Sequence, residues 1–358
     1  MSDSSAPPTH LPLEDANLVH TNTFPAFQGK ESKARNFRPL RTFFIYLTLA
    51  ILLFFALRNA PLDEIWNTLS QLQLWQIAVL FGLNIFIYAL ITLRWWIIAR
   101  AENKHVAYAP LLLVRLAVFG VSYFTLGPHV GGEPLQVFYL QRKYKFTYMH
   151  ATASVILDKL LELLANFFLL ALGLTAIFQA GILSTNGISS WLSLSGLVLL
   201  CIWPPVQILL LYKQKYPLTT VLRSMAFIKK DAKAVRFVAA SERLAGAFCR
   251  RHLSSLLFAV LISLCAGAGM VGEFALITNF LHIQLPFWQT VSAWTAGWLS
   301  LLTPLPGGLG ALEASQVFAL GLFGISATSA ISVTLLMRGR DILIGGIGLL
   351  LAGRGVAK

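Results

Sequence analysis

The chain has 358 residues, of which 56% are hydrophobic and 12% are charged. A soluble domain carries about twice that charged fraction, so the composition excludes an ordinary soluble protein. The formal net charge of +13 comes from Lys and Arg residues that lie between long apolar runs. This placement argues against nucleic-acid binding and is typical of a membrane protein that contacts anionic lipid headgroups.

Residues 1–41 are polar and lack the apolar core of a signal peptide, so we expect them to form a disordered tail. The tail ends in a basic cluster, Lys30–Arg41, directly before the first apolar run at 42–60. The positive-inside rule therefore predicts a cytoplasmic N-terminus. A second span is predicted over 74–99, and the sequence RWWIIAR at Arg94–Arg100 is typical of an anchor at the membrane interface.

The next segment, 108–148, contains the sequence LGPHVGGEPLQVFYL at Leu126–Leu140. Its Pro residues break helices and its Gly residues allow tight turns. Both ends of the segment are predicted on the cytoplasmic side, and the arm 134–141 is too short to cross a membrane. We therefore predict a re-entrant hairpin with its tip at Pro128, Gly131 and Gly132. Two full spans joined by a tight turn, or an ordinary loop, are the alternatives.

Two further spans are predicted at 149–179 and 191–212, and a basic cytoplasmic loop follows at 213–252. This loop holds ten Lys and Arg residues against two acidic residues. Part of it is predicted either to form a helix that lies on anionic lipid or to remain an ordinary loop. A fifth span is predicted at 253–280.

The sequence LTPLPGGLGALEASQVFAL, at Leu302–Leu320, repeats the pattern Pro-x-x-Gly-Gly followed by a glutamate. We predict a second re-entrant hairpin here, over 286–323, that enters from the opposite face of the membrane. Its predicted tip is formed by Pro304, Pro306, Gly307, Gly308 and Gly310. A last span at 327–352 and a short cytoplasmic tail at 355–358 complete the chain.

The predicted fold is therefore an all-α polytopic integral membrane protein, with its transmembrane domain at 42–354. We expect about six full transmembrane helices and two oppositely oriented re-entrant hairpins, in an arrangement that resembles an inverted repeat. Non-helical backbone is tolerated at membrane depth where protein or a water-filled cavity satisfies its polar groups. Paired helix breaks in two halves of a chain are typical of a transporter with a central binding site.

Charged residues inside the apolar segments form the candidate site. Each one costs at least about 2.5 kcal/mol at the bilayer centre, so we expect these side chains to face inward and to pair. Asp158 and Glu162 are predicted to share a helix face, and Lys159 and Glu162 to form an i,i+3 pair. The predicted headgroup and translocation residues are Arg115, Glu133, Asp158, Lys159, Glu162, Glu273, Glu313, Arg338, Arg340 and Asp341. Purely structural pairing of these residues is the alternative.

Such a mixed acidic and basic lining suits a polar lipid headgroup. Arg338 or Arg340 is predicted to bind a phosphate through two parallel hydrogen bonds. A proton-coupled step through Asp158, Glu162 or Glu313 is also chemically reasonable. The scattered His, Cys and acidic residues show no metal-ligand spacing, and we expect no metal, no cofactor and no catalytic residue.

At these positions the sequence resembles the lysylphosphatidylglycerol synthase transmembrane region, also called the flippase-like domain family. The resemblance rests on RWWIIARAENK, on GPHVGGEPLQVFYLQRKYKFTYMHATASVILDKLLELL and on TPLPGGLGALEASQVFALGLFGISATSAISVTLLMRGRD. It implies a membrane domain that moves phospholipids, or isoprenoid or hopanoid lipids, between leaflets. The residues that match the family pattern are Pro128, Gly132, Glu133, Asp158, Pro306, Gly307, Gly308, Gly310, Glu313 and Arg338.

Some positions depart from that pattern. The family often has arginine in and after its first Pro-Gly patch, where this chain has His129, Val130 and Gln136. The family usually has Asp-Arg where this chain has Asp158 and Lys159. The larger synthases also carry an aminoacyl-transferase domain, which we do not expect in this chain. The absence of arginine near the first hairpin tip weakens the expectation that an anionic headgroup binds there.

Three functions are compatible with these residues. The first is a lipid flippase-like protein of the bacterial inner membrane, with both termini cytoplasmic, acting as a facilitator or driven by an ion gradient. The second is a non-transporting accessory subunit that works with a separate lipid-modifying enzyme. The third is an integral-membrane enzyme that acts on a lipid headgroup, which the scattered candidate nucleophiles and bases disfavour. Membrane lipids, either an anionic phospholipid or an isoprenoid lipid, are the expected partners in each case, and nucleic acid is not an expected partner.

Overall fold

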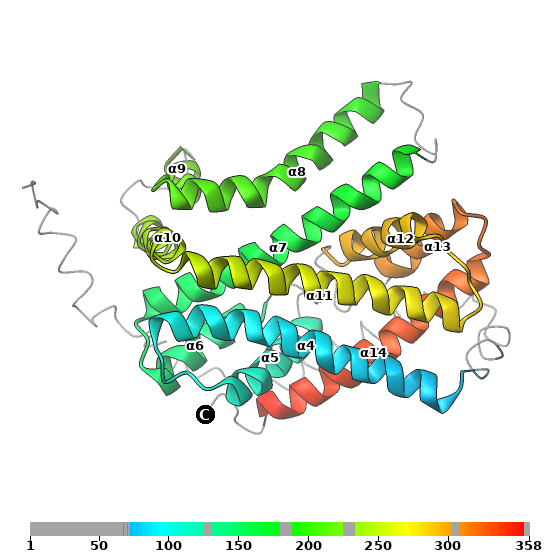
Figure 1. Ribbon diagram of the computed structural model, residues 1–358, viewed down its shortest axis with the longest axis horizontal. Helices are drawn as coiled ribbons and strands as arrows, with labels where there is room; N and C mark the ends of the chain where they lie inside the picture. Colours follow the sequence, from blue (N-terminus) through cyan, green and yellow to red (C-terminus); the bar gives the residue numbers. More distant parts are fainter. Residues whose placement is uncertain are drawn as a thin grey trace, which may run out of the picture. The chain divides into compact units, whose positions relative to one another are not determined.

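The computed structural model describes residues 72–124, 131–179, 188–224, 233–302 and 310–353, together with Asn67, Ser70 and Gly308. These ranges form eleven helices, α4 to α14, and contain no strand (Figure 1). Contacts divide the chain into Met1–Thr48 and Leu49–Lys358, and all of the described residues belong to the second unit. The predicted tail, the predicted first span at 42–60 and most of both predicted hairpin tips lie outside the described residues.

Five long helices follow the predicted spans closely. Two of them, α4 (Leu74–Glu102) and α11 (Leu253–Phe280), are long and apolar enough to cross a membrane. The others are α7 (Tyr148–Gln179), α8 (Ile188–Tyr212) and α14 (Ala327–Gly353). α7 and α14 carry three charged residues each within their apolar sequence, and these charges belong to the candidate site. The all-helical prediction is confirmed, while the number of full spans stays a prediction.

Each predicted hairpin corresponds to a pair of shorter helices, one on each side of its Pro/Gly stretch. The first pair is α5 (Tyr108–Tyr123) and α6 (Glu133–Tyr144), and the second is α12 (Phe287–Ser300) and α13 (Ala311–Gly321). At 1.5 Å per residue, the longest of these spans about 24 Å, which is less than the hydrocarbon core of about 30 Å.

A glutamate in the first turn of the second helix of each pair accepts a hydrogen bond from a preceding glycine. The backbone N–H of Gly131 donates to Glu133 Oε2 at 2.8 Å, and the N–H of Gly310 donates to Glu313 Oε2 at 2.9 Å. A carboxylate at a helix N-terminus is also favoured by the helix dipole. The glutamate that follows each Gly-rich stretch therefore ties the start of the next helix to a glycine of that stretch.

The basic stretch 213–252 forms two helices, α9 (Pro217–Ser224) and α10 (Lys233–Arg251). The apolar face of α10, which includes Val235, Ala245 and Phe248, is buried, and the helix packs against α7 and α8. The helix that we predicted as one alternative is present. Its apolar face contacts protein and not lipid, because α7 and α8 cover it.

Helices α5 and α14 approach each other so closely that glycine is required at their contact. A Cβ atom on Gly120 would lie 2.5 Å from the carbonyl oxygen of Gly345, and one on Gly348 would collide with the carbonyl oxygen of Leu116. Small residues that let backbones approach are typical of helix packing in membranes. The first helix of the first pair is thereby fixed against the last helix of the chain.

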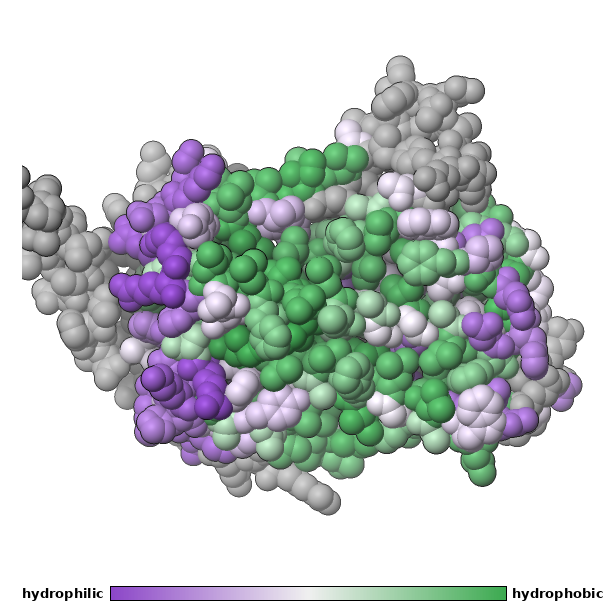
Figure 2. All heavy atoms as spheres, in the orientation of Figure 1, coloured by the Kyte–Doolittle hydropathy of each residue, from purple (hydrophilic) through white to green (hydrophobic). Residues whose placement is uncertain are grey.

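Large apolar side chains cover much of the outer surface. Figure 2 shows a broad hydrophobic area across the middle of this face, with the strongest hydrophilic clusters towards its ends. Phe81, Phe86, Phe258 and Leu261, on the neighbouring helices α4 and α11, are each about half exposed. Soluble monomers rarely expose continuous apolar surface on this scale. The surface suits contact with lipid hydrocarbon.

Candidate functional site

A cavity lies among α4, α5, α6, α7, α11, α12 and α14. The volume of the cavity is about 190 Å³. Both hairpin helix pairs contribute to its wall, the first through Ser122, Glu133 and Gln136 and the second through Trp294 and Trp298. Helices that sequence analysis assigned to two separate Pro/Gly motifs therefore meet at one cavity, whose largely apolar wall carries several charged side chains.

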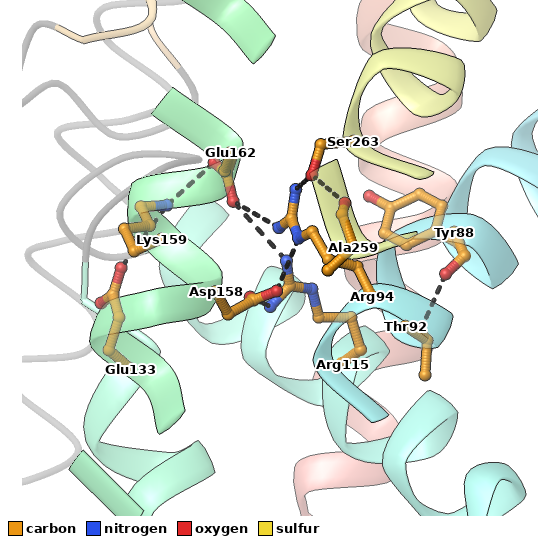
Figure 3. A network of polar contacts seen from close by, with 10 residues as sticks. All are labelled: Tyr88, Thr92, Arg94, Arg115, Glu133, Asp158, Lys159, Glu162, Ala259 and Ser263. Atoms are coloured by element: carbon orange, nitrogen blue, oxygen red, sulfur yellow. Dashed lines mark hydrogen bonds and ion pairs between the residues drawn. The ribbon is translucent and has the colours of Figure 1, made fainter. Parts of the chain in front are cut away.

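Asp158 on α7 is the centre of an ion network that we name the α7 network (Figure 3). Its Oδ1 accepts from Arg94 Nε at 2.7 Å, and its Oδ2 accepts from Arg115 Nη1 at 2.8 Å. The side chains of Arg94 and Asp158 are each only 2% exposed. One buried carboxylate therefore holds two guanidinium groups, from α4 and from α5.

Glu162 lies one turn further along α7, on the same face. Its Oε2 is 3.5 Å from both Arg94 Nη2 and Arg115 Nη2, and its Oε1 accepts from Lys159 Nζ at 3.0 Å. Lys159 also lies 3.8 Å from Glu133 on α6, and both of these side chains are 31% exposed. The predicted shared face and i,i+3 pair are confirmed, and the network extends from a buried core to an accessible edge (Figure 3).

Arg94 is the main residue of this network that sequence analysis missed. We placed it with Trp95 in an anchor at the membrane interface, but Trp95 is fully buried and Arg94 contacts Asp158. Only Trp96 and Arg100 keep the expected character, with the Arg100 guanidinium 4.6 Å from the Trp96 ring centre. The excess of carboxylates over cations in the predicted site is the feature that could have pointed to a further arginine.

A second network joins α4, α11 and α14. Glu273 pairs with Arg340, and it also accepts from Asn84 Nδ2 at 2.6 Å. Arg340 Nη2 lies 2.7 Å from Asp341 Oδ1. Glu273, Arg340 and Asp341 all line the cavity. Asn84 was not predicted, because an uncharged amide inside an apolar helix carries a weaker sequence signal than a charge.

Arg338 and Glu313 form a separate pair that links α14 to α13. Arg338 Nη2 donates to Glu313 Oε2 at 2.7 Å and to the carbonyl oxygen of Gly308 at 3.0 Å, and Arg338 Nε also pairs with Glu313. The Arg338 side chain is 4% exposed. Neither Arg338 nor Glu313 belongs to the described residues that line the cavity. The pair attaches the second Pro/Gly stretch to the last helix.

The predicted phosphate-binding role of these arginines stays a prediction. The donors of Arg338 are used by Glu313 and Gly308, and those of Arg340 are used by Glu273 and Asp341. Each predicted charged residue in the described helices does have a partner of opposite charge, as the cost of charge at membrane depth requires.

The hairpin tips themselves are described only in part. Pro128, Pro304, Pro306 and Gly307 lie outside the described residues. Of the tip residues that are described, Gly131, Gly308 and Gly310 adopt positive φ angles. Gly132 packs so closely on Val118 and Ser122 that a Cβ atom would lie 2.6 Å from them. These positions require glycine for turning or for close contact, as predicted.

Comparison with known proteins agrees with this architecture. Residues 42–348 match the family described as "Lysylphosphatidylglycerol synthase TM region", a range that includes both ion networks and all of the residues that line the cavity. Among curated proteins and among solved structures, nothing matches the chain. The match covers most of the chain and fits its apolar helices and lipid-facing surface. The chain therefore belongs to the lysylphosphatidylglycerol synthase transmembrane-region family, a family of membrane domains with a lipid-related function.

Proposed function

We propose that this protein is a lipid flippase-like membrane protein, which moves a lipid between leaflets by sheltering its headgroup in the cavity. The observation that carries the proposal is the position of the cavity. It is lined by ionised residues such as Asp158, Glu162 and Arg340, on helices whose outer faces are apolar. A headgroup can occupy polar space of this kind while the acyl chains stay in hydrocarbon.

The proposed mechanism involves no chemical step and no metal or cofactor. The two helix pairs act as re-entrant hairpins from opposite faces, in a protein of about six full spans. The protein lies in the inner membrane with both termini in the cytoplasm, as the distribution of Lys and Arg predicts. It acts as a facilitator or is driven by an ion gradient. Coupling to a proton gradient is chemically reasonable because the carboxylates of the cavity can take up protons.

A leaflet-exchange assay with purified protein in liposomes tests the proposal. The informative variants are Glu162→Gln and Lys159→Met, which alter the accessible edge of the α7 network. Their matched controls are Glu102→Gln and Lys104→Met, which remove the same charges at exposed positions at the end of α4. Headgroup-labelled phospholipids and isoprenoid lipids serve as probes, and size-exclusion chromatography checks that each variant is folded.

We expect exchange by the wild type and by both controls, and loss of at least tenfold in the two network variants, equivalent to about 1.4 kcal/mol. Lys159 is partly exposed, so its replacement leaves a test even if Glu162→Gln does not fold. Absence of exchange with every lipid class would refute the proposal. It would favour the alternative of a non-transporting accessory subunit, in which the networks only hold the helices together.

A further inference from the structure

The charges that line the cavity are unequal in number. Among the described residues of its wall there are five carboxylates, from Glu133, Asp158, Glu162, Glu273 and Asp341, and three cations, from Arg115, Lys159 and Arg340. Each of these cations is already paired with at least one carboxylate. A phosphate placed among them would meet excess negative charge and would have to break existing ion pairs, which is costly for buried groups.

An ammonium group faces a different difficulty. The carboxylate oxygens are shared with arginine or lysine at 2.7 to 3.5 Å, as for Asp158, Glu162 and Asp341. A bound amine would compete with these cations for the same oxygens. A neutral hydroxyl group does not compete in this way, because it can donate to the remaining lone pairs of a carboxylate while the ion pair stays intact.

The cavity also holds an amide without a partner. Gln136 is on α6, lines the cavity and is 2% exposed. Its Nε2 is buried and has no hydrogen-bond partner among the described residues. A buried polar group without a partner is costly and uncommon in folded proteins, so it calls for a ligand or an ordered water. This Nε2 can therefore donate a hydrogen bond to a hydroxyl oxygen of a ligand.

The remaining wall is suited to an uncharged ligand. Asn166 adds a second buried amide, and Tyr88, Trp294 and Trp298 add aromatic surface. Amides that hydrogen-bond hydroxyl groups, beside aromatic rings that pack against C–H groups, can together select a polyol. Binding pockets generally combine apolar walls with a few such polar groups that fix the orientation of the ligand.

We propose that the cavity binds the uncharged, hydroxyl-bearing end of a lipid headgroup, with the Gln136 carboxamide as the residue that selects it. This inference rests on the proposed lipid-handling function and names the chemistry of its cargo. The hydroxyl groups can belong to the sugar of a glycolipid or to the glycerol of phosphatidylglycerol. Hydroxyls of either kind donate to the carboxylates and accept from Gln136 Nε2, and no ion pair has to break.

Lipid binding to the purified full-length protein, measured by native mass spectrometry, tests this inference separately from transport. The probes are monoglucosyl diacylglycerol, phosphatidylglycerol, phosphatidylethanolamine and phosphatidic acid with identical acyl chains. The variant is Gln136→Met, which keeps the length of the side chain and removes its amide. The matched control is Gln141→Leu, an exposed glutamine on the same helix.

We expect one or both polyol lipids to bind about tenfold more tightly than phosphatidylethanolamine and phosphatidic acid, and Gln136→Met to abolish that preference. Tight binding of the glucolipid alone identifies a sugar, and tight binding of phosphatidylglycerol alone identifies glycerol. Gln136→Asn, which shortens the amide, is expected to weaken binding as well and gives a result if the Met variant does not fold. Equal binding of all four lipids, preference for the amine or phosphate probe, or an unchanged preference in both variants would overturn the inference. Leaflet exchange that continues without polyol selectivity would do so while leaving the proposed function intact.

Discussion

Replacement of Asp158 by Asn is expected to destabilise the protein strongly. The carboxylate accepts from two guanidinium groups at 2.7 and 2.8 Å, and Arg94 and Arg115 are 2% and 12% exposed. Asparagine offers one neutral acceptor oxygen and turns an N–H₂ group towards the second guanidinium. Breaking a buried ion pair costs about 3–5 kcal/mol, since the remaining charge is left uncompensated. Glu162 lies 3.5 Å from both arginines and compensates in part, so we expect about 3 kcal/mol.

The measurement is the free energy of unfolding in mixed micelles, with SDS as the denaturant. Glu102→Gln removes an exposed carboxylate and serves as the control, with an expected change within about 0.5 kcal/mol. Arg94→Gln is expected to cost less than Asp158→Asn, because Asp158 keeps its contact with Arg115 at 2.8 Å. A loss below about 1 kcal/mol for Asp158→Asn, or the reverse order of these two variants, would refute the reasoning.

Three further predictions concern other parts of the structure. Gly348→Val is expected to reduce the yield of folded protein sharply, because a Cβ atom at this position collides with the Leu116 carbonyl oxygen. Gly346 has open space around it, so Gly346→Val is the control and should be tolerated. Size-exclusion chromatography measures the folded yield of both variants. Burial raises the pKa of the Cys249 thiol from 9.0 to about 11. The buried neutral thiol therefore contributes its full stability below pH 9, and this contribution is lost as the pH rises towards 11. Melting temperatures measured across this pH range should show the decline in the wild type and not in Cys249→Ala. Glu242→Gln is expected to cost about 1.5–3 kcal/mol and to increase proteolysis of α9, because Glu242 accepts from the Thr219 N–H at 2.8 Å and from its hydroxyl at 2.6 Å; unchanged proteolysis would contradict this.

Much of the helical framework could be predicted from the sequence. The predicted fifth span coincides with α11, and the predicted spans at 149–179 and 327–352 each differ from a helix by one residue at one end. Apolar runs identify such helices because a helix in lipid must be apolar along most of its length. The expectation that intramembrane charges pair was equally well founded, since an unpaired charge at that depth is too costly.

The identity of the partners could not be predicted in the same way. Arg94 is 64 residues from Asp158 in the chain, and only the packing of α4 against α7 brings them together. Its neighbour Trp95 resembles an interface residue in sequence, although it is fully buried. Gln136 entered the sequence analysis only as a departure from a family pattern. A neutral amide has no large cost at membrane depth, so its place in the cavity emerges only from the three-dimensional structure.

The glycine contact between α5 and α14 limits how the protein can move. Helices that touch backbone to backbone at Gly120 and Gly348 cannot slide by one turn, because the side chains next in line would collide with the opposing main chain. Arg115 on α5 and Arg340 on α14 must therefore travel together as parts of a single rigid body. In the proposed transport function, alternation between inward-open and outward-open states would take place at other helix contacts. Spin labels placed on these two helices should then keep a constant separation whichever state is populated.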